Sequence, residues 1–257
     1  MPIIQQQFKL IKRKGWMFLV LVMLIGAKGN SLQARSQKGC DTVLYFVYEN
    51  APRMEKILPG PPALQDARFY YDWVQYCDTK ALRDTPRGDT ARKDARFSAS
   101  YMMERFGQAI GCKMTPATHP ELFQLLNSIH AAERSAGASA KKYFRRKRPY
   151  QQFHEPTGLP QHERATDFTS YPSGHTSSAW LAGMLFSALA PDCQEAIMKT
   201  AYEMGQSRVI LGFHYQSDVD DGRLTGSVVF ARLCSEPAFL QQLQKAQKEF
   251  NRNRLGV

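Results

Sequence analysis

The chain has 257 residues, of which 43% are hydrophobic, so a packed core is possible and a wholly disordered protein is excluded. Its formal net charge of +11 by itself suggests a nucleic-acid or membrane-surface partner. Removing the six basic residues that precede residue 36, where no acidic residue occurs, leaves 28 basic against 23 acidic residues, a mildly basic domain of charge +5.

Residues 1–34 have the pattern of a secretory signal peptide. Basic residues cluster within 9–14, an apolar segment covers 16–25, and small residues place the cleavage site after Gly29 or Ala34. The apolar segment is shorter than the roughly 20 residues that span a bilayer, although an uncleaved N-terminal anchor is the alternative. We therefore expect a domain over 35–257 that is periplasmic or secreted and has no stable membrane insertion.

Export permits disulfide bonds. The chain has five cysteines, none in a CxxC or zinc-binding spacing: Cys40, Cys77, Cys112, Cys193 and Cys234. We expect one or two bridges and at least one free thiol, with the pairing open.

Residues 36–62 are irregular, with a short extended piece around 43–48, and the pattern after residue 62 is helical. Apolar spacing and helix-start signals predict helices over 63–77, 89–106, 120–131, 135–148, 175–189, 193–204, 214–234 and 237–251. Pro and Gly residues predict a loop over 150–171. Strand signals are few, so the predicted fold class is all-α, a single compact helical domain.

The first candidate site segment is residues 141–149 (KKYFRRKRP). Lys141 and Arg148 are seven residues apart, about two turns of the predicted helix, so both would lie on one face. Arg145, four residues after Lys141, would share that face. Such a set of cations suits the oxygens of a phosphate, whereas the alternative is a solvated basic run or a polyanion-binding surface.

The second segment is residues 171–176 (YPSGHT), which joins a loop to an apolar helix. The first turn of a helix offers free backbone N–H groups to an anion. Ser173 would cap the helix or donate to a phosphate oxygen, Gly174 would let the backbone N–H approach, and His175 would stand beside the anion. The alternative is an ordinary serine cap followed by a turn glycine.

The third segment is residues 207–218 (SRVILGFHYQSD). His214 and Asp218 have the i, i+4 spacing that lets a carboxylate accept from Nδ1–H, which leaves Nε2 free as a nucleophile. Arg208 would be a third phosphate clamp. The alternatives are a surface His–Asp pair and, with Asp220 and Asp221, a Mg²⁺ or Ca²⁺ site. We interpret those two aspartates as solvated or packing residues and expect no metal and no cofactor.

Together the segments read Lys-x6-Arg-Pro, Pro-Ser-Gly-His and Ser-Arg-x5-His-x3-Asp. This resembles the type-2 phosphatidic acid phosphatase superfamily, which also contains vanadium haloperoxidases, and within it the class A bacterial non-specific acid phosphatases. The likeness extends to residues 82–87 and 216–220. Thr169 and Leu211 depart from the glycine and cysteine that this family often has.

The resemblance implies an active site between helices and a role for each residue of the three segments. His214 would attack phosphorus and form a phosphohistidine, Asp218 would orient it, and His175 would act as general acid and then base. The phosphate oxygens would be held by Lys141, Arg148, Ser173, Gly174 and Arg208. We therefore expect a metal-independent acid phosphatase with a broad range of phosphomonoesters and an acidic working range.

The expected partners are small phosphate esters including nucleotides, not nucleic acid, and the resemblance suggests a homodimer. Three other functions would use parts of the same sequence: a vanadium haloperoxidase, a membrane lipid phosphatase, and a polyanion-binding protein. The lipid phosphatase would need several hydrophobic spans. Outside the three segments, His154 and His162 are expected as exposed loop residues that could line the entrance, and Asp94 and Glu104 as supporting residues.

Overall fold

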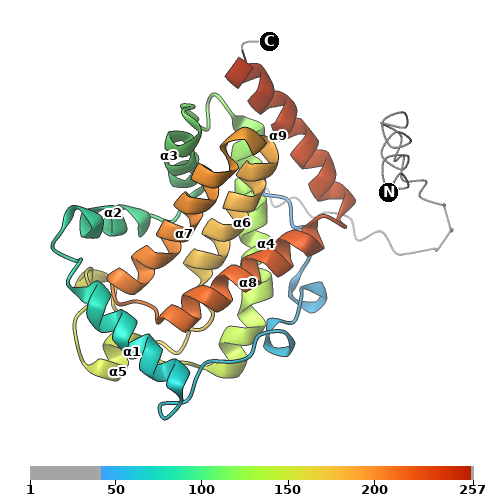
Figure 1. Cartoon of the computed structure of the whole chain (residues 1–257). Coiled ribbons are helices and arrows are strands. Elements are labelled where there is room, and N and C mark those ends of the chain that lie inside the picture. Colours follow the sequence, from blue (N-terminus) through green and yellow to red (C-terminus); the bar gives the residue numbers. More distant parts are fainter. Residues whose placement is uncertain (1–41, 256–257) are drawn as a thin grey trace, which may run out of the picture. The chain divides into compact units, whose positions relative to one another are not determined.

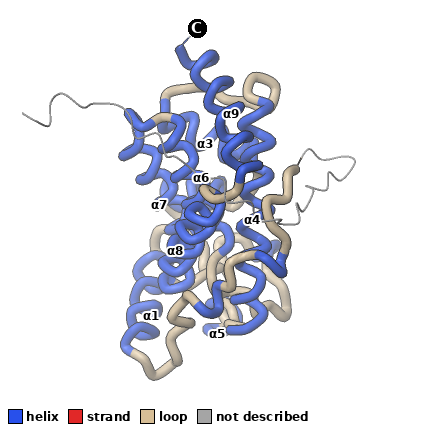
Figure 2. The backbone as a smooth tube through the Cα atoms, turned by 90° about the vertical axis from the view of Figure 1, so that its right-hand side faces the viewer, coloured by secondary structure: helices blue, strands red, loops and turns tan. Residues whose placement is uncertain are grey.

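The computed structural model describes residues 42–255, so the predicted signal peptide and Cys40 lie outside the described residues. The described helices are α1 (Ala67–Lys80), α2 (Pro86–Asp94), α3 (Ala99–Ile110), α4 (Pro120–Phe144), α5 (Pro149–Phe153), α6 (Gly174–Leu189), α7 (Gln194–Ile210), α8 (Gln216–Leu233) and α9 (Pro237–Leu255). Short 3-10 helices occur at Tyr48–Asn50, Met54–Lys56, Pro160–His162 and Pro191–Cys193. Within 42–255 there is no strand, which confirms the all-α prediction (Figure 2). The short extended piece around 43–48 does not form one.

Helix α6 is the central element of the described part and packs against α4, α7 and α8 (Figure 1). It is apolar around most of its circumference, which is typical of a buried helix. Two glycines let its neighbours approach closely. A Cβ on Gly183 would lie 2.8 Å from the Cβ of Ala201 on α7, and one on Gly226 of α8 would lie 2.6 Å from the carbonyl oxygen of Ser177. The backbone N–H of Ser173 donates to the carbonyl of Asp218 at 2.9 Å, so the start of α6 lies against the first turn of α8.

Helix α4 is one helix of 25 residues, where the sequence predicted two helices, over 120–131 and 135–148. The residues between the two predicted helices are Ala132, Glu133 and Arg134, and none of them is a helix-breaking glycine or proline. The helix ends at Phe144 because Arg145 adopts a left-handed conformation, with φ of 48°. Arg148 is extended, with ψ of 157°, as expected before a proline. The prediction of a helix reaching residue 148 is therefore wrong.

The segment predicted as one helix over 89–106 is two helices, α2 and α3. Ser98 interrupts it, because its side chain accepts a hydrogen bond from the N–H of Tyr101 and caps α3. α3 ends at Ile110, and Gly111 after it has φ of 71°. The break leaves Phe97 between the two helices, where its side chain can face the site.

The remaining expectations need smaller corrections. Residues 150–171 are mostly loop, as predicted, but begin within α5 and contain a 3-10 turn at Pro160–His162. The expected one or two bridges do not occur among the described cysteines, since Cys77, Cys112, Cys193 and Cys234 are all free and lie on different segments. Among the described helices, none has the length and apolar character needed to cross a membrane.

Candidate active site

The three segments converge on one cavity of about 410 Å³. Its lining comes from the link between α2 and α3, one face of α4 and the loop after it, the loop before α6 and the start of α6, and the loop between α7 and α8. The lining residues are Phe97, His130, Glu133, Arg134, Gly137, Ala138, Lys141, Arg148, Thr169, Gly174, His175 and His214. A neighbouring cavity of about 200 Å³ shares Arg148, Thr169 and His175 and is also lined by Arg208. Ser173 and Asp218 are fully buried directly behind these residues.

The imidazole of His214 is buried and its two nitrogens have different partners. Nε2 lies 2.9 Å from Nη1 of Arg148, and Nδ1 lies 3.2 Å from Oδ2 of Asp218. Because a guanidinium can only donate, Nε2 must accept, and the proton must be on Nδ1, which donates to Asp218. Burial, together with Arg148, lowers the pKa of His214 to about 3. The ring is therefore neutral with its lone pair on Nε2.

The carboxylate of Asp218 is completely buried and accepts several hydrogen bonds. Besides His214, its donors are Ser170 Oγ at 2.5 Å, the N–H of Tyr215 at 3.0 Å and Arg146 Nη1 at 2.6 Å. Burial alone would raise the pKa of Asp218, but Arg146 and the hydrogen bonds from His214 and Ser170 hold it well below its ordinary value. Asp218 is therefore a fixed negative charge behind the imidazole.

The predicted reason for the His214–Asp218 contact needs a correction. α8 begins at Gln216, so His214 precedes the helix rather than lying on it. Asp218 is in the first turn and reaches back to the N–H of Tyr215, the residue that caps the helix. The contact therefore comes from the capping geometry of the helix start.

Arg146 is a residue that the sequence reasoning missed. Its Nη1 also donates to Ser217 Oγ at 2.8 Å, its Nη2 donates to Asp72 at 2.8 Å, and its guanidinium lies 3.8 Å from the ring centroid of Tyr215. It thereby compensates two carboxylates, those of Asp72 and Asp218, that are both 0% exposed. In the sequence Arg146 was only one member of a basic run, and its spacing from the other residues did not set it apart from them.

Arg145 does not share the phosphate-facing side with Lys141, contrary to the prediction. It is exposed after the end of α4, and its guanidinium lies 5.3 Å from the ring centroid of Phe168. Lys141 and Arg148 do line one cavity, but the turn at Arg145 brings them together rather than two helical turns.

Arg148 is held by four acceptors. Its Nε donates to Asp167 at 2.8 Å, Nη1 to the carbonyl of Phe213 at 3.0 Å and to His214, and Nη2 to Thr169 Oγ1 at 3.3 Å. Burial would raise the pKa of Asp167, but Thr169 and Arg148 lower it to about 2. The sequence carried no signal for Asp167, which lies in an irregular loop. The result is a guanidinium whose orientation is fixed before any ligand arrives.

Lys141 and Arg208 lack ion-pair partners among residues 42–255. Lys141 Nζ donates to backbone carbonyls, at 3.0 Å to Thr169 and also to Pro172, and burial followed by Arg148 lowers its pKa to about 8. Arg208 is 5% exposed, lies 4.7 Å from the ring centroid of Phe213 and has no acceptor for its Nε. Burial and Arg148 lower its pKa to about 9. Arg208 is buried and Lys141 half-buried, and such cations without a carboxylate partner suit the binding of an anion.

The start of α6 adds hydrogen-bond donors and a second imidazole. Ser173 Oγ caps the helix, accepting from Thr176 N at 3.4 Å and from Thr176 Oγ1 at 2.9 Å. Gly174 lines the cavity, and the ring of His175 lies 4.4 Å from that of Phe97. Burial, followed by Arg208, His214, Arg148 and Lys141, holds the pKa of His175 well below its ordinary value. The second imidazole is therefore neutral while the cavity holds no anion.

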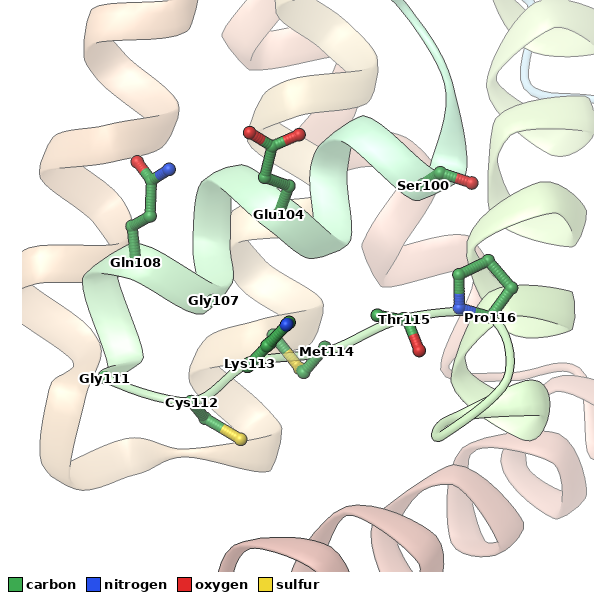
Figure 3. A pocket seen from close by; sticks show the side chains of 10 residues that line it. All are labelled: Ser100, Glu104, Gly107, Gln108, Gly111, Cys112, Lys113, Met114, Thr115 and Pro116. Carbon is green, nitrogen blue, oxygen red and sulfur yellow. The ribbon is translucent and has the colours of Figure 1, made fainter.

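The supporting residues proposed from sequence separate into two groups. Asp94 accepts from Ser207 Oγ at 2.6 Å and thereby holds the end of α7 beside Arg208. Glu104 is exposed and lines a different cavity of about 510 Å³, between α3 and the segment over 111–116, so its expected role at the site is wrong (Figure 3). His154 is exposed at the end of α5, and exposed His162 lines the smaller cavity beside Arg208.

The two other aspartates of α8 have protein partners. Asp220 pairs with Arg223 at 2.7 Å, and Asp221 accepts from the Tyr171 hydroxyl at 2.7 Å and from Arg68 at 3.4 Å. In the part of the chain that is described, no group of three or more His, Cys, Asp or Glu side chains is arranged to hold a metal ion. The two adjoining cavities together offer the cations Lys141, Arg148 and Arg208, a helix N-terminus, a neutral imidazole with its lone pair on Nε2, and a second imidazole.

Comparison with known proteins gives one consistent result. The PAP2 superfamily matches residues 121–238, which include all three segments. The non-specific acid phosphatase of Providencia stuartii is 40% identical over 211 residues, which cover 80% of this chain and 85% of that protein. That of Salmonella typhi is 38% identical over 205 residues, 79% of this chain and 82% of that protein. The acid phosphatase of Zymomonas mobilis subsp. mobilis is 26% identical over 236 residues, 91% of this chain and 88% of that protein.

Proposed function

This chain belongs to the non-specific acid phosphatases of the PAP2 superfamily, and from that premise we propose that it is an exported, metal-independent acid phosphatase that hydrolyses phosphomonoesters through a phosphohistidine. One observation carries the proposal: buried His214, with its lone pair on Nε2, lines a cavity beside Lys141, the adjoining cavity is lined by Arg208, and neither cation has a carboxylate partner among the described residues. Such a cavity binds an anion and presents it to a nucleophile.

In the proposed complex the phosphate oxygens act as the acceptors that the cations lack in the free protein. Lys141, Arg148 and Arg208 would each donate to a phosphate oxygen, together with the Gly174 N–H and the Ser173 hydroxyl. In phosphoryl transfer the charge is spread over the equatorial oxygens, so fixed donors around them supply most of the catalysis. The contacts that already hold Arg148 limit its reorganisation when the substrate binds.

In the first step the Nε2 lone pair of His214 attacks phosphorus and the bond from phosphorus to the ester oxygen breaks. Arg148 Nη1 moves from Nε2 to a phosphate oxygen. The departing oxygen takes a proton from His175, acting as general acid. The phosphorylated imidazole keeps its Nδ1 proton and is positively charged, and the buried carboxylate of Asp218 stabilises it.

In the second step neutral His175 removes a proton from a water molecule as the water oxygen attacks phosphorus. The bond from phosphorus to Nε2 breaks, its electron pair returns to His214, and inorganic phosphate leaves. His175 is then protonated for the next cycle. Two imidazoles and three cations account for all the charge and proton transfers, so no step requires a metal.

The same arrangement favours an acidic working range. His214 stays an unprotonated nucleophile in acid because its pKa is about 3. His175 must be protonated, and the cations that lower its pKa are neutralised when a phosphate dianion binds. Substrate binding thus raises the pKa of His175, and activity falls as pH rises above that value.

We further propose small phosphate esters, including nucleotides, as substrates, a periplasmic or secreted location, and a homodimer. The substrate class is supported by a cavity of about 410 Å³ with aromatic and basic lining residues. A panel of phosphomonoesters and of nucleoside mono-, di- and triphosphates, assayed with the purified mature protein, separates a broad preference from a nucleotide preference.

The direct test of the function uses p-nitrophenyl phosphate. The wild type should hydrolyse it at acidic pH, His214→Ala should abolish hydrolysis, and a chelator should leave the wild-type rate unchanged. Lys147→Ala, an exposed change in the same basic run as Arg148, is the matched control and should keep full activity. Loss of activity with the chelator would instead support a metal-dependent reaction.

A further inference from the structure

Glu133 is the single carboxylate among the described residues that line the 410 Å³ cavity. It lies on α4 in register with Ile129, Gly137 and Lys141, each four residues from the next, and is 3% exposed. A carboxylate in the wall of an anion site opposes binding when ionised, and the phosphate chemistry described above assigns it no role.

The carboxyl group of Glu133 is close to the part of the cavity that would hold the phosphate. A Cβ on Gly137 would lie 3.3 Å from its Oε1, so the glycine leaves space for it. A Cβ on Gly174 would lie 3.7 Å and 3.9 Å from its two oxygens and 3.9 Å from Cε of Lys141. An anion held by Gly174 and Lys141 is therefore a close neighbour of Glu133.

The partners of Glu133 are neutral. Ser178 Oγ donates to Oε2 at 3.0 Å, and Ser178 Oγ lies 3.1 Å from Nδ1 of His130. A protonated Glu133 is equally compatible with these hydrogen bonds, because the hydroxyl of Ser178 can then accept from the carboxylic acid and donate to His130. No ion pair joins Glu133 to a cation in the described range 42–255.

The charged and titratable groups that face Glu133 across the cavity come from every wall: His130, Arg134 and Lys141 on α4, His175 on α6, and Arg148 and His214 from the adjoining loops. Burial raises the pKa of Glu133, with Lys141, Ser178 and Arg134 acting in the opposite direction. Burial also lowers the pKa of His130 to about 4, so this neighbour is neutral across the mildly acidic range.

We propose that the protonation state of Glu133 controls phosphate binding at this cavity. In acid Glu133 is neutral and allows phosphate to bind, and once it ionises it repels phosphate. The inference rests on the proposed function of the cavity and adds a determinant of its pH dependence. Because bound phosphate disfavours the ionised form, phosphate binding and Glu133 protonation reinforce each other. Phosphate affinity should therefore fall as pH rises through the pKa of Glu133.

The test is calorimetric binding of inorganic phosphate to the full mature protein, from about pH 4.5 to about pH 7, for the wild type and Glu133→Gln. Both proteins should bind phosphate similarly at the acidic end. At the neutral end the variant should bind about tenfold more tightly than the wild type, as expected if one like charge shifts the linked pKa by about one unit. Glu133→Asp, which keeps the charge, should keep the wild-type loss of affinity.

Glu104→Gln, an exposed glutamate outside this cavity, is the matched control and should follow the wild type at every pH. If wild type and Glu133→Gln lose affinity in parallel, the proposed role of Glu133 is overturned, even where the variant alters thermal stability. If the wild type binds no phosphate at any pH, the proposed function itself fails. The two failures are thus distinguishable.

Discussion

Nη1 of Arg148 donates a hydrogen bond to Nε2 of His214 at 2.9 Å, and Nε of the same guanidinium donates to Asp167 at 2.8 Å. This contact fixes the tautomer of the imidazole and keeps Nε2 unprotonated. In the proposed mechanism, a phosphate that accepts from Nη1 would release the Nε2 lone pair when the substrate binds. The same cation would then protect the proposed nucleophile in the free protein and bind the substrate in the complex.

The tautomer of His214 can be measured directly. Nitrogen-15 NMR of the free enzyme should show Nδ1 protonated and Nε2 unprotonated, with no change down to about pH 4, because burial and Arg148 lower the pKa of His214 to about 3. Asp218→Asn should weaken the preference for the Nδ1–H tautomer and reduce kcat by about 10²–10⁴-fold. An imidazolium signal for His214 near pH 5 would contradict the assignment.

The proposed role of His175 as general acid predicts a dependence on the leaving group. His175→Ala should reduce hydrolysis of alkyl phosphates by about 10²–10⁴-fold, because an alkoxide needs a proton to depart. The loss in the first step should be much smaller for p-nitrophenyl phosphate, whose leaving group is stable as an anion. Single-turnover rates for the two substrates measure this step. Equal losses for both would show that His175 does not protonate the leaving oxygen.

Arg208 predicts opposite effects on stability and binding. Its guanidinium is buried without an acceptor for Nε, which is unfavourable in the free protein. Arg208→Met fills similar space without the charge, so the free variant should be at least as stable as the wild type. Saturating phosphate should raise the Tm of the wild type and raise that of the variant much less. A destabilised variant with an undiminished phosphate shift would contradict a phosphate-binding Arg208.

Replacing Arg146 should lower the stability of the fold, whereas Lys141 and Arg148 of the same basic run are proposed to bind phosphate. Arg146→Ala leaves the buried carboxylates of Asp72 and Asp218 without their cation, so the free energy of unfolding at neutral pH should fall by about 3–5 kcal/mol. The deficit should shrink in acid, because Arg146 is a cause of the lowered pKa of Asp218, and without Arg146 that carboxylate can take up a proton. Denaturant unfolding at both pH values measures this. Lys147→Ala should match the wild type, and a mild, pH-independent loss in Arg146→Ala would exclude the compensating role.

The residues that the sequence identified are those that carry chemistry in fixed motifs, and the structure brings all eight to the 410 Å³ cavity, to the adjoining one or directly behind them. The geometry that the sequence predicted for two of these contacts was wrong. Lys141 and Arg148 meet through a left-handed turn at Arg145, and His214 reaches Asp218 through the start of α8. In both pairs the sequence separation still predicted that the residues lie close together, because residues only four or seven positions apart cannot lie far from each other.

The residues that the sequence missed act through contacts between distant segments. Arg146 donates to Asp72, which is 74 residues away in the sequence, and Arg148 is oriented by Asp167, which lies in an irregular loop. No local pattern encodes such partners. Glu133 did have a signal, since it occupies a position of the apolar face that continues from Leu126 and Ile129. The helix prediction stopped at residue 131 and hid that register.

The central claim is a covalent phosphohistidine on His214, and trapping it is the most direct test. His175→Ala should still transfer the phosphoryl group from p-nitrophenyl phosphate but should activate water poorly, so the intermediate should accumulate. After an alkaline quench, which preserves phosphohistidine, peptide mass spectrometry should find one phosphoryl group on His214. A phosphoryl group on another residue, or none during turnover by the variant, would contradict the account.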